Sequence, residues 1–166
     1  MIYLKELDLY IDKITTEQYL KYLEYVDDNS IDNIEKKYLI IKTLTGLSMD
    51  RIQEINTWDV DNIYCELYLY ILTVEEKFAV VCEDGLGIKP VKQEKSIFDD
   101  YDKENGYEDF EEKLTESQKR VQMINFFIRY MSTNHKLSYD GFMKSDLSAL
   151  LDNINYNFKY DREHKK

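Results

Sequence analysis

The stretch WDVDNIYCELYLYIL, residues 58–72, decides the fold class, because its pattern supports two interpretations. Over residues 63–71 aliphatic residues and cysteine alternate with tyrosines and a glutamate, as they do in a β-strand with one buried face. Thr57 immediately before the stretch, and the acids Asp59 and Asp61 within it, are typical of a helix start. We favour the helix, because the cap and the acids agree, and the strand stays open as the alternative.

The region before this stretch carries start and stop signals for three helices. Thr15, with Gln18 three residues later, forms a capping box that opens the first helix. A second helix is predicted from about Ile31 to Leu44, and Gly46 is placed to end it, because glycine adopts positive φ at little cost. Ser48 predicts the cap of a third, short helix.

Two further regions contain candidate strands. Residues 1–11 fit either a strand or a helix. Residues 77–83, KFAVVCE, predict a strand, because they are short, apolar and followed by a turn-forming Asp-Gly pair. The segment GIKPV, residues 87–91, is expected to return beside it as an edge strand. The sequence therefore predicts a small β-hairpin near 77–91.

The C-terminal region is predicted to be helical. Thr115 and Gln118 form a second capping box, and Ser145 predicts the cap of a last helix. The fold class expected for the whole chain is α+β, predominantly α-helical, with one small β-hairpin. The chain is expected to form one domain in three successive parts: a helical part ending in the small hairpin (1–91), an acidic loop (92–114) and C-terminal helices on the same core (115–160).

Acidic residues dominate the charge of the chain. Its 166 residues hold 33 acids against 22 bases, and nine acids and two lysines between Asp99 and Glu116 contribute −7 to the net charge of −11. Such a charge repels phosphate groups, so direct binding to nucleic acid or to a membrane is not expected. No apolar run approaches the roughly 20 residues of a membrane span, and no secretory signal opens the chain. Cys65 and Cys82 are therefore expected as buried thiols in a reducing compartment.

Residues 100–113, DYDKENGYEDFEEK, resemble a calcium loop of the EF-hand type. When Gly106 occupies the turn position of such a loop, a tyrosine and Lys103 fall on the first two ligand positions, and an ammonium group cannot bind a cation. When Asp100 is the first ligand, Gly106 lies one place too late. We therefore expect no calcium site.

No motif in the sequence predicts catalysis. The two histidines, His135 and His164, do not share metal-ligand spacing with the cysteines, and no nucleophile motif is present. The expectation is a protein that is not an enzyme and uses no cofactor and no metal.

Partner contact is expected from the acidic segment and from aromatic residues, because tyrosine combines an apolar ring with a polar tip. The candidate partner-binding residues are Asp99, Asp100, Tyr101, Asp102, Tyr107, Asp109, Phe110 and Trp58. Trp58, the single tryptophan, is favoured as a core residue, with partner contact as the alternative.

A family resemblance rests on ITTEQYLKYLEYV and YLIIKTLTGLSMDRIQEINTWDVDNIY, within residues 14–64. The shared pattern is an Ile-Thr and Gln-Tyr helix opening followed by a spaced block of apolar and turn residues. The matching residues are Ile14, Thr15, Gln18, Tyr19, Ile41, Leu44, Thr45, Gly46, Ser48, Ile52, Ile55 and Asp59. On these residues the chain resembles small assembly proteins of tailed bacteriophages, of the tail assembly chaperone or neck and tail type.

The resemblance implies a phage structural or assembly protein of the tail or neck region, which acts by binding other proteins. Its partners would be other phage structural proteins, with a homo-oligomer as a further possibility, and its location the virion or the host cytoplasm. The family carries no catalytic residues, so none are transferred. The alternative from the charge is an acidic inhibitor that mimics DNA and occupies a basic host protein.

Overall fold

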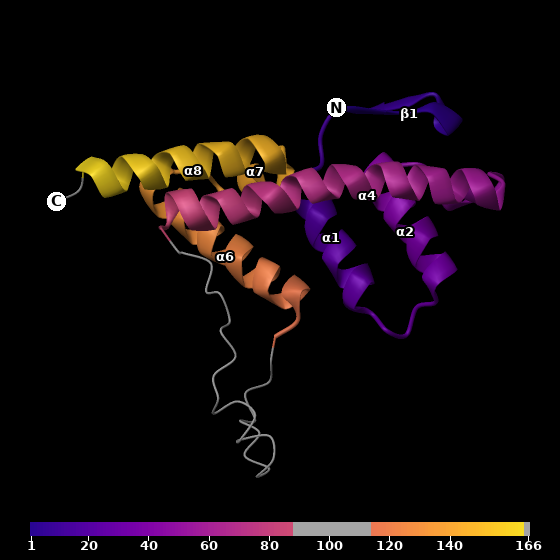
Figure 1. Cartoon of the computed structure of the whole chain (residues 1–166), viewed down its shortest axis with the longest axis horizontal. Coiled ribbons are helices and arrows are strands. Elements are labelled where there is room, and N and C mark those ends of the chain that lie inside the picture. Colours follow the sequence, from indigo (N-terminus) through magenta and orange to yellow (C-terminus); the bar gives the residue numbers. More distant parts are fainter. Residues whose placement is uncertain (88–113, 165–166) are drawn as a thin grey trace, which may run out of the picture.

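A long central helix organises the molecule. The computed structural model describes residues 1–87 and 114–164. Helix α4 runs from Thr57–Val80 and continues as one π-helical turn, η2, over Val81–Gly85. The N-terminal hairpin and the C-terminal helix run alongside it, and the other long helices meet it at an angle (Figure 1). The helix interpretation of 58–72 is therefore confirmed. The cap, however, is Asn56, whose side chain accepts a hydrogen bond from the Asp59 N–H, and Thr57 is the first helical residue.

Three helices precede α4, as the capping signals predict: α1 (Thr16–Asp27), α2 (Asn33–Thr45) and α3 (Met49–Gln53). Thr15 and Gln18 form the expected reciprocal capping box. Gly46 ends α2 with φ of 73°, a left-handed conformation that favours glycine. The Ser48 hydroxyl accepts from the Arg51 N–H and so caps α3.

Three helices follow the region between the described parts: α6 (Glu116–His135), α7 (Tyr139–Lys144) and α8 (Leu147–His164). The capping box of Thr115 and Gln118 is confirmed at the start of α6. The prediction for Ser145 is wrong, because Ser145 ends α7, a helix that the sequence analysis did not predict. The Asp146 carboxylate instead accepts from the Ser148 N–H, at 3.0 Å, in the first turn of α8.

The β-hairpin lies at the N-terminus and not near 77–91. Strand β1 (Ile2–Leu4) pairs antiparallel with β2 (Leu9–Ile11) around the short helix η1 (Lys5–Leu7). Residues 77–85 instead belong to α4 and η2, because Phe78 and Val81 continue the buried helical face that Val74 belongs to. Residues 88–91 are outside the described part. The fold class is confirmed: among residues 1–87 and 114–164 the protein is predominantly helical, with one two-stranded sheet.

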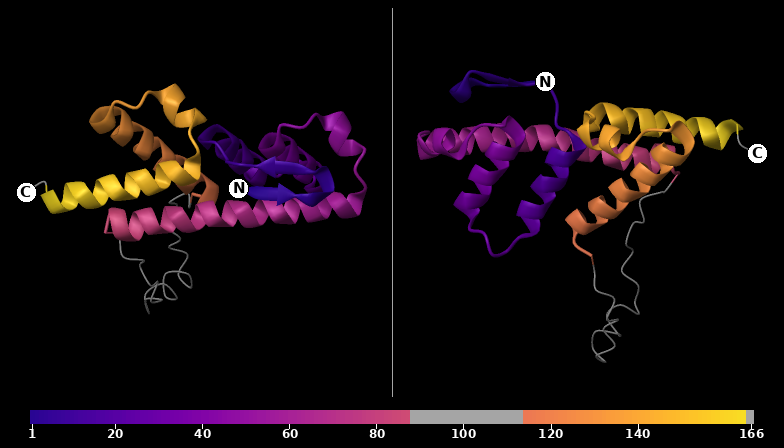
Figure 2. Two further views of the ribbon diagram at one scale, coloured as in Figure 1. Left: turned by 90° about the horizontal axis from the view of Figure 1, so that it is seen from above. Right: turned by 180° about the vertical axis from the view of Figure 1, so that it is seen from behind.

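An aromatic stack forms the centre of the core. Tyr19 of α1 stacks on Phe78 of α4 at a ring-centroid distance of 5.6 Å, and Phe78 stacks on Phe127 of α6 at 6.2 Å. Phe127 in turn meets Phe158 of α8 at 6.0 Å. Figure 2 shows these helices gathered on one side of α4. One core thus joins helices from both ends of the chain.

Backbone hydrogen bonds also tie the two ends of the chain together. The Leu147 N–H donates to the Ile14 carbonyl at 2.9 Å, and the Thr16 N–H donates to the Ser145 carbonyl at 3.3 Å. These bonds form an isolated antiparallel bridge between Thr15 and Asp146. The starts of α1 and α8 are therefore held side by side.

The expectation of two buried thiols is only half right. Cys82 is half-buried and lies 3.7 Å from the Met123 sulfur, whereas Cys65 is exposed on α4. Burial raises the pKa of the Cys82 thiol. None of the helices in the described part is both long and apolar enough to cross a membrane.

Candidate partner-binding clefts between α1, α4 and α6

Two adjoining clefts open where α1, α4 and α6 meet. The first, of about 450 Å³, lies between α1 and the start of α6. It is lined by Leu23, Glu24, Asp27, Leu114, Ser117, Gln118, Val121 and Gln122. The second, of about 300 Å³, lies between all three helices. It is lined by Tyr22, Leu23, Val26, Tyr68, Ile71, Leu72, Glu75, Glu116, Ser117 and Arg120. Leu23 and Ser117 belong to both linings, so the clefts adjoin along the first turn of α6.

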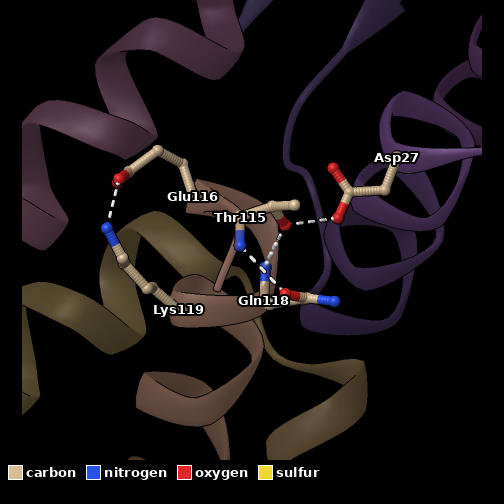
Figure 3. Close-up of polar contacts among 5 residues, drawn as sticks. All are labelled: Asp27, Thr115, Glu116, Gln118 and Lys119. Atoms are coloured by element: carbon tan, nitrogen blue, oxygen red, sulfur yellow. Dashed lines mark hydrogen bonds and ion pairs between the residues drawn. The ribbon is translucent and has the colours of Figure 1, made fainter. Parts of the chain in front are cut away.

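The first turn of α6 is fixed by local sequence. Thr115 accepts from the Gln118 N–H through its hydroxyl oxygen at 3.1 Å, and its own N–H donates to the Gln118 side chain at 2.9 Å. The same hydroxyl donates to the Asp27 carboxylate at 2.7 Å (Figure 3). Thr115 therefore caps its own helix and links that helix to the end of α1.

A surface ion pair lies beside this cap. The Lys119 ammonium is 2.6 Å from the Glu116 carboxylate in the first turn of α6 (Figure 3). The hydrogen bond from Lys119 lowers the pKa of the Glu116 carboxyl. Both side chains are well exposed, so the pair adds little to stability and leaves polar groups at the rim of the cleft.

A half-buried polar network forms one wall of the second cleft. The Arg120 Nε donates to one oxygen of Glu75 at 2.6 Å, and the Tyr19 hydroxyl donates to the other. The Arg120 guanidinium also lies over the Phe78 ring, 5.0 Å from its centroid. Burial and the bond to Glu75 raise the pKa of Tyr19 strongly, so this hydroxyl stays protonated. The network joins α1, α4 and α6 and fixes the shape of the cleft.

The clefts combine apolar walls with an acidic rim. Exposed apolar side chains reach the surface from all three sides: Val26, Tyr68, Leu72 and Leu114. The linings contain four carboxylates, from Glu24, Asp27, Glu75 and Glu116, against the single guanidinium of Arg120. The lining charge is therefore negative, with Lys21 and Lys119 paired to two of the rim carboxylates.

The linings of the clefts combine apolar side chains with charged ones. In the two ranges that the structure describes, no group of three or more histidines, cysteines, aspartates or glutamates could hold a metal ion. An apolar floor with a charged rim is the arrangement found at protein interfaces.

The sequence-predicted site residues fall mostly outside the described ranges. Asp99, Asp100, Tyr101, Asp102, Tyr107, Asp109 and Phe110 all do, as does the calcium-like loop 100–113. Trp58 is described, and it is 75% exposed in the first turn of α4. The prediction that Trp58 lies in the core is therefore wrong. Val60 lies on the buried face of α4, and Trp58, two residues earlier, lies on its exposed side. Trp58 lines neither cleft.

The cleft residues themselves were not predicted as a site. Tyr68 and Leu72 lie in the stretch 58–72, which predicts a helix and no binding surface, and Val26 lies in the helix that Thr15 opens. The available signal was the capping box at Thr115, which places α6 next to the acidic segment. No pattern in the sequence indicates that α1 would be the neighbour of α6.

Comparisons with known proteins add no relative. No family model, no curated protein and no solved structure matches this chain.

Proposed function

We propose that this chain is an assembly or structural protein of tailed bacteriophages that acts by binding other proteins in the tail or neck region. The resemblance over residues 14–64 supports the phage assignment. The pair of clefts between α1, α4 and α6 supports the binding mode and is the observation that carries it, because apolar side chains are left exposed beside a rigid polar network.

The occupant of the clefts is proposed to be a basic amphipathic segment of a partner protein. The cleft linings carry more carboxylates than cations, and the sequence from Asp99 to Glu116, which leads into α6, adds a net charge of −7. Lysine or arginine side chains on the segment would pair with rim groups such as Asp27. Its apolar face would cover Leu72 and Leu114.

The test places a photo-crosslinking amino acid at Gln122, which lines the first cleft, in the full chain produced from its own genome. The matched control carries the same amino acid at Tyr156, which is exposed on α8 and lines neither of these clefts. We expect a portal, tail or capsid protein to crosslink at position 122 and not at 156. Mass spectrometry of the crosslinked peptide should identify a segment rich in lysine or arginine.

A second pair of variants tests whether the apolar walls are used. Leu114→Lys and Val121→Lys place cations inside the first cleft and should abolish the crosslink at 122 while the circular dichroism spectrum stays helical. Crosslinking to a host nuclease alone would contradict the phage assignment and favour the mimic of DNA. The absence of any crosslink at 122 would rule out the cleft as a binding site.

A further inference from the structure

Helix α4 is apolar on two opposite faces. Its inner face is buried in the core and consists of Val60, Ile63, Leu67, Ile71, Val74 and Phe78. Its outer face carries Trp58, Cys65, Leu69, Leu72 and Val80, all of them exposed. A helix that is apolar on both sides is normally covered on both sides. Among residues 1–87 and 114–164, nothing buries this second face.

The outer face has the spacing of a helix–helix contact. Trp58, Cys65 and Leu72 follow one another at intervals of seven residues, and Leu69 lies four after Cys65 and three before Leu72. This alternation of three and four is the pattern of a helical seam. The residues from Trp58 to Val80 extend about 33 Å along the helix. In the left view of Figure 2 the other helices and the hairpin lie to one side of α4, so the helix borders the described part of the molecule.

The two ends of the outer face lie symmetrically about Leu69, whereas by the same count Cys65 meets Thr73 and Leu72 meets Glu66. Trp58 lies eleven residues before Leu69 and Val80 lies eleven after it, so an antiparallel copy would place these two apolar side chains together. By the same count Asn62 meets Glu76, and Leu69 meets its own copy. A two-fold contact requires this kind of self-complementarity, because each copy presents the same surface.

The distribution of charge favours the antiparallel direction. The acids Glu76 and Glu83 lie toward the C-terminal end of the outer face, and the middle of the seam is uncharged. A parallel pair would align the acids of one copy with the same acids of the other, which is unfavourable. An antiparallel pair avoids this alignment, because it places Glu76 opposite the uncharged Asn62. Glu66 is at the flank of the seam, with one of its carboxylate oxygens fully buried.

We infer that the outer face of α4 is the contact surface for a second copy of this chain, packed antiparallel across a two-fold axis near Leu69. Leu69 contributes to neither cleft lining, so the centre of this contact lies outside the proposed partner-binding clefts. Leu72 contributes to both surfaces, which places the second copy beside the second cleft.

The test measures the mass of the full chain by analytical ultracentrifugation across a concentration series. The expected species has twice the 20.0 kDa mass of one chain. Leu69→Glu would place two carboxylates together at the axis and should raise the dissociation constant of the dimer at least about 100-fold, because like charges in an interface cost several kcal/mol. Tyr156→Glu, at a side chain of similar exposure on α8, should leave the dissociation constant unchanged.

A crosslinking experiment tests the register. In a Cys65→Ser background, the variant carrying both Trp58→Cys and Val80→Cys should form dimers with a short bis-maleimide, and each single variant should not. The native thiol gives a further readout, since Cys65 should be protected from maleimide at high protein concentration and become reactive on dilution.

Three results would overturn the inference. A wild-type chain that stays monomeric at all concentrations with a reactive Cys65 would show that the face is open. A monomer with a protected Cys65 would show that another part of the same chain covers the face. A dimer that Leu69→Glu does not weaken would place the contact elsewhere on the molecule.

Discussion

The two faces of α4 have similar composition and different surroundings. Ile71 and Leu72 are neighbours in sequence, yet Ile71 is buried and Leu72 is exposed beside a cleft. The inner face is covered by helices of the same chain, and Phe78 lies in the centre of the aromatic stack. The difference shows that apolar side chains of one helix can serve two purposes. The inner face holds the chain together, and no residue in the ranges 1–87 and 114–164 covers the outer face.

The largest effect is expected on the inner face. Phe78→Ala removes the ring between Tyr19 and Phe127 and leaves a cavity in the core. We expect the free energy of unfolding to fall by about 3–5 kcal/mol, which is typical of a buried phenylalanine. Urea denaturation followed by circular dichroism measures this change. A loss below 1 kcal/mol would mean that the aromatic stack does not stabilise the fold.

A smaller loss of unfolding free energy is expected for a substitution at the edge between the two faces of α4. Glu75→Gln removes the charge that pairs with Arg120 and retains a side chain of the same shape. The Arg120 side chain is 22% exposed, so leaving its guanidinium without the carboxylate should lower the free energy of unfolding by about 1–3 kcal/mol. The double-mutant cycle with Arg120→Met measures the coupling between the two side chains. If the losses of unfolding free energy in the two single variants simply add in the double variant, Glu75 and Arg120 are not energetically coupled.

An effect of about 1 kcal/mol is expected at Thr115, away from both faces. Thr115→Ala removes the cap of α6 and the hydrogen bond to Asp27. Thr115→Ser is the matched control, because it keeps the hydroxyl and should restore most of the stability. If alanine and serine were equally destabilising, the methyl group and not the hydroxyl would hold the start of α6.

The smallest effect on the monomer is expected on the outer face. Leu69 is 62% exposed, so Leu69→Ser should change the unfolding free energy by no more than about 0.5 kcal/mol at a concentration where the chain is monomeric. Ile71→Ser, on the inner face two residues later, should destabilise the fold severely. Equal losses for the two variants would mean that both faces are buried in the folded monomer.

Local signals made much of the fold predictable from the sequence. The capping boxes at Thr15 and Thr115, the stop at Gly46 and the cap at Ser48 all involve residues within a few positions of one another. Such signals depend on the backbone of one turn only, so the sequence states them directly. The six-residue helix α7 shows the limit of such signals, since Ser138 caps it and the sequence analysis did not identify this cap.

Contacts between distant segments could not be predicted in this way. Residues 77–83 have strand character, but Phe78 and Val81 complete the inner face of α4, and this packing outweighs local preference. Trp58 and Cys65 were expected in the core because they are apolar, and both lie on the outer face. The clefts depend on α1 lying next to α6, and no pattern within either helix encodes that neighbour.

The bridge between Thr15 and Asp146 has a consequence for synthesis on the ribosome. The chain emerges from its N-terminus, so the Ile14 carbonyl is available long before the Leu147 N–H that donates to it. Helix α1 can form early, but its first turn cannot dock until α8 has left the exit tunnel. The part of the inner face of α4 that packs on α6 and α8 therefore stays uncovered until these two helices have been made.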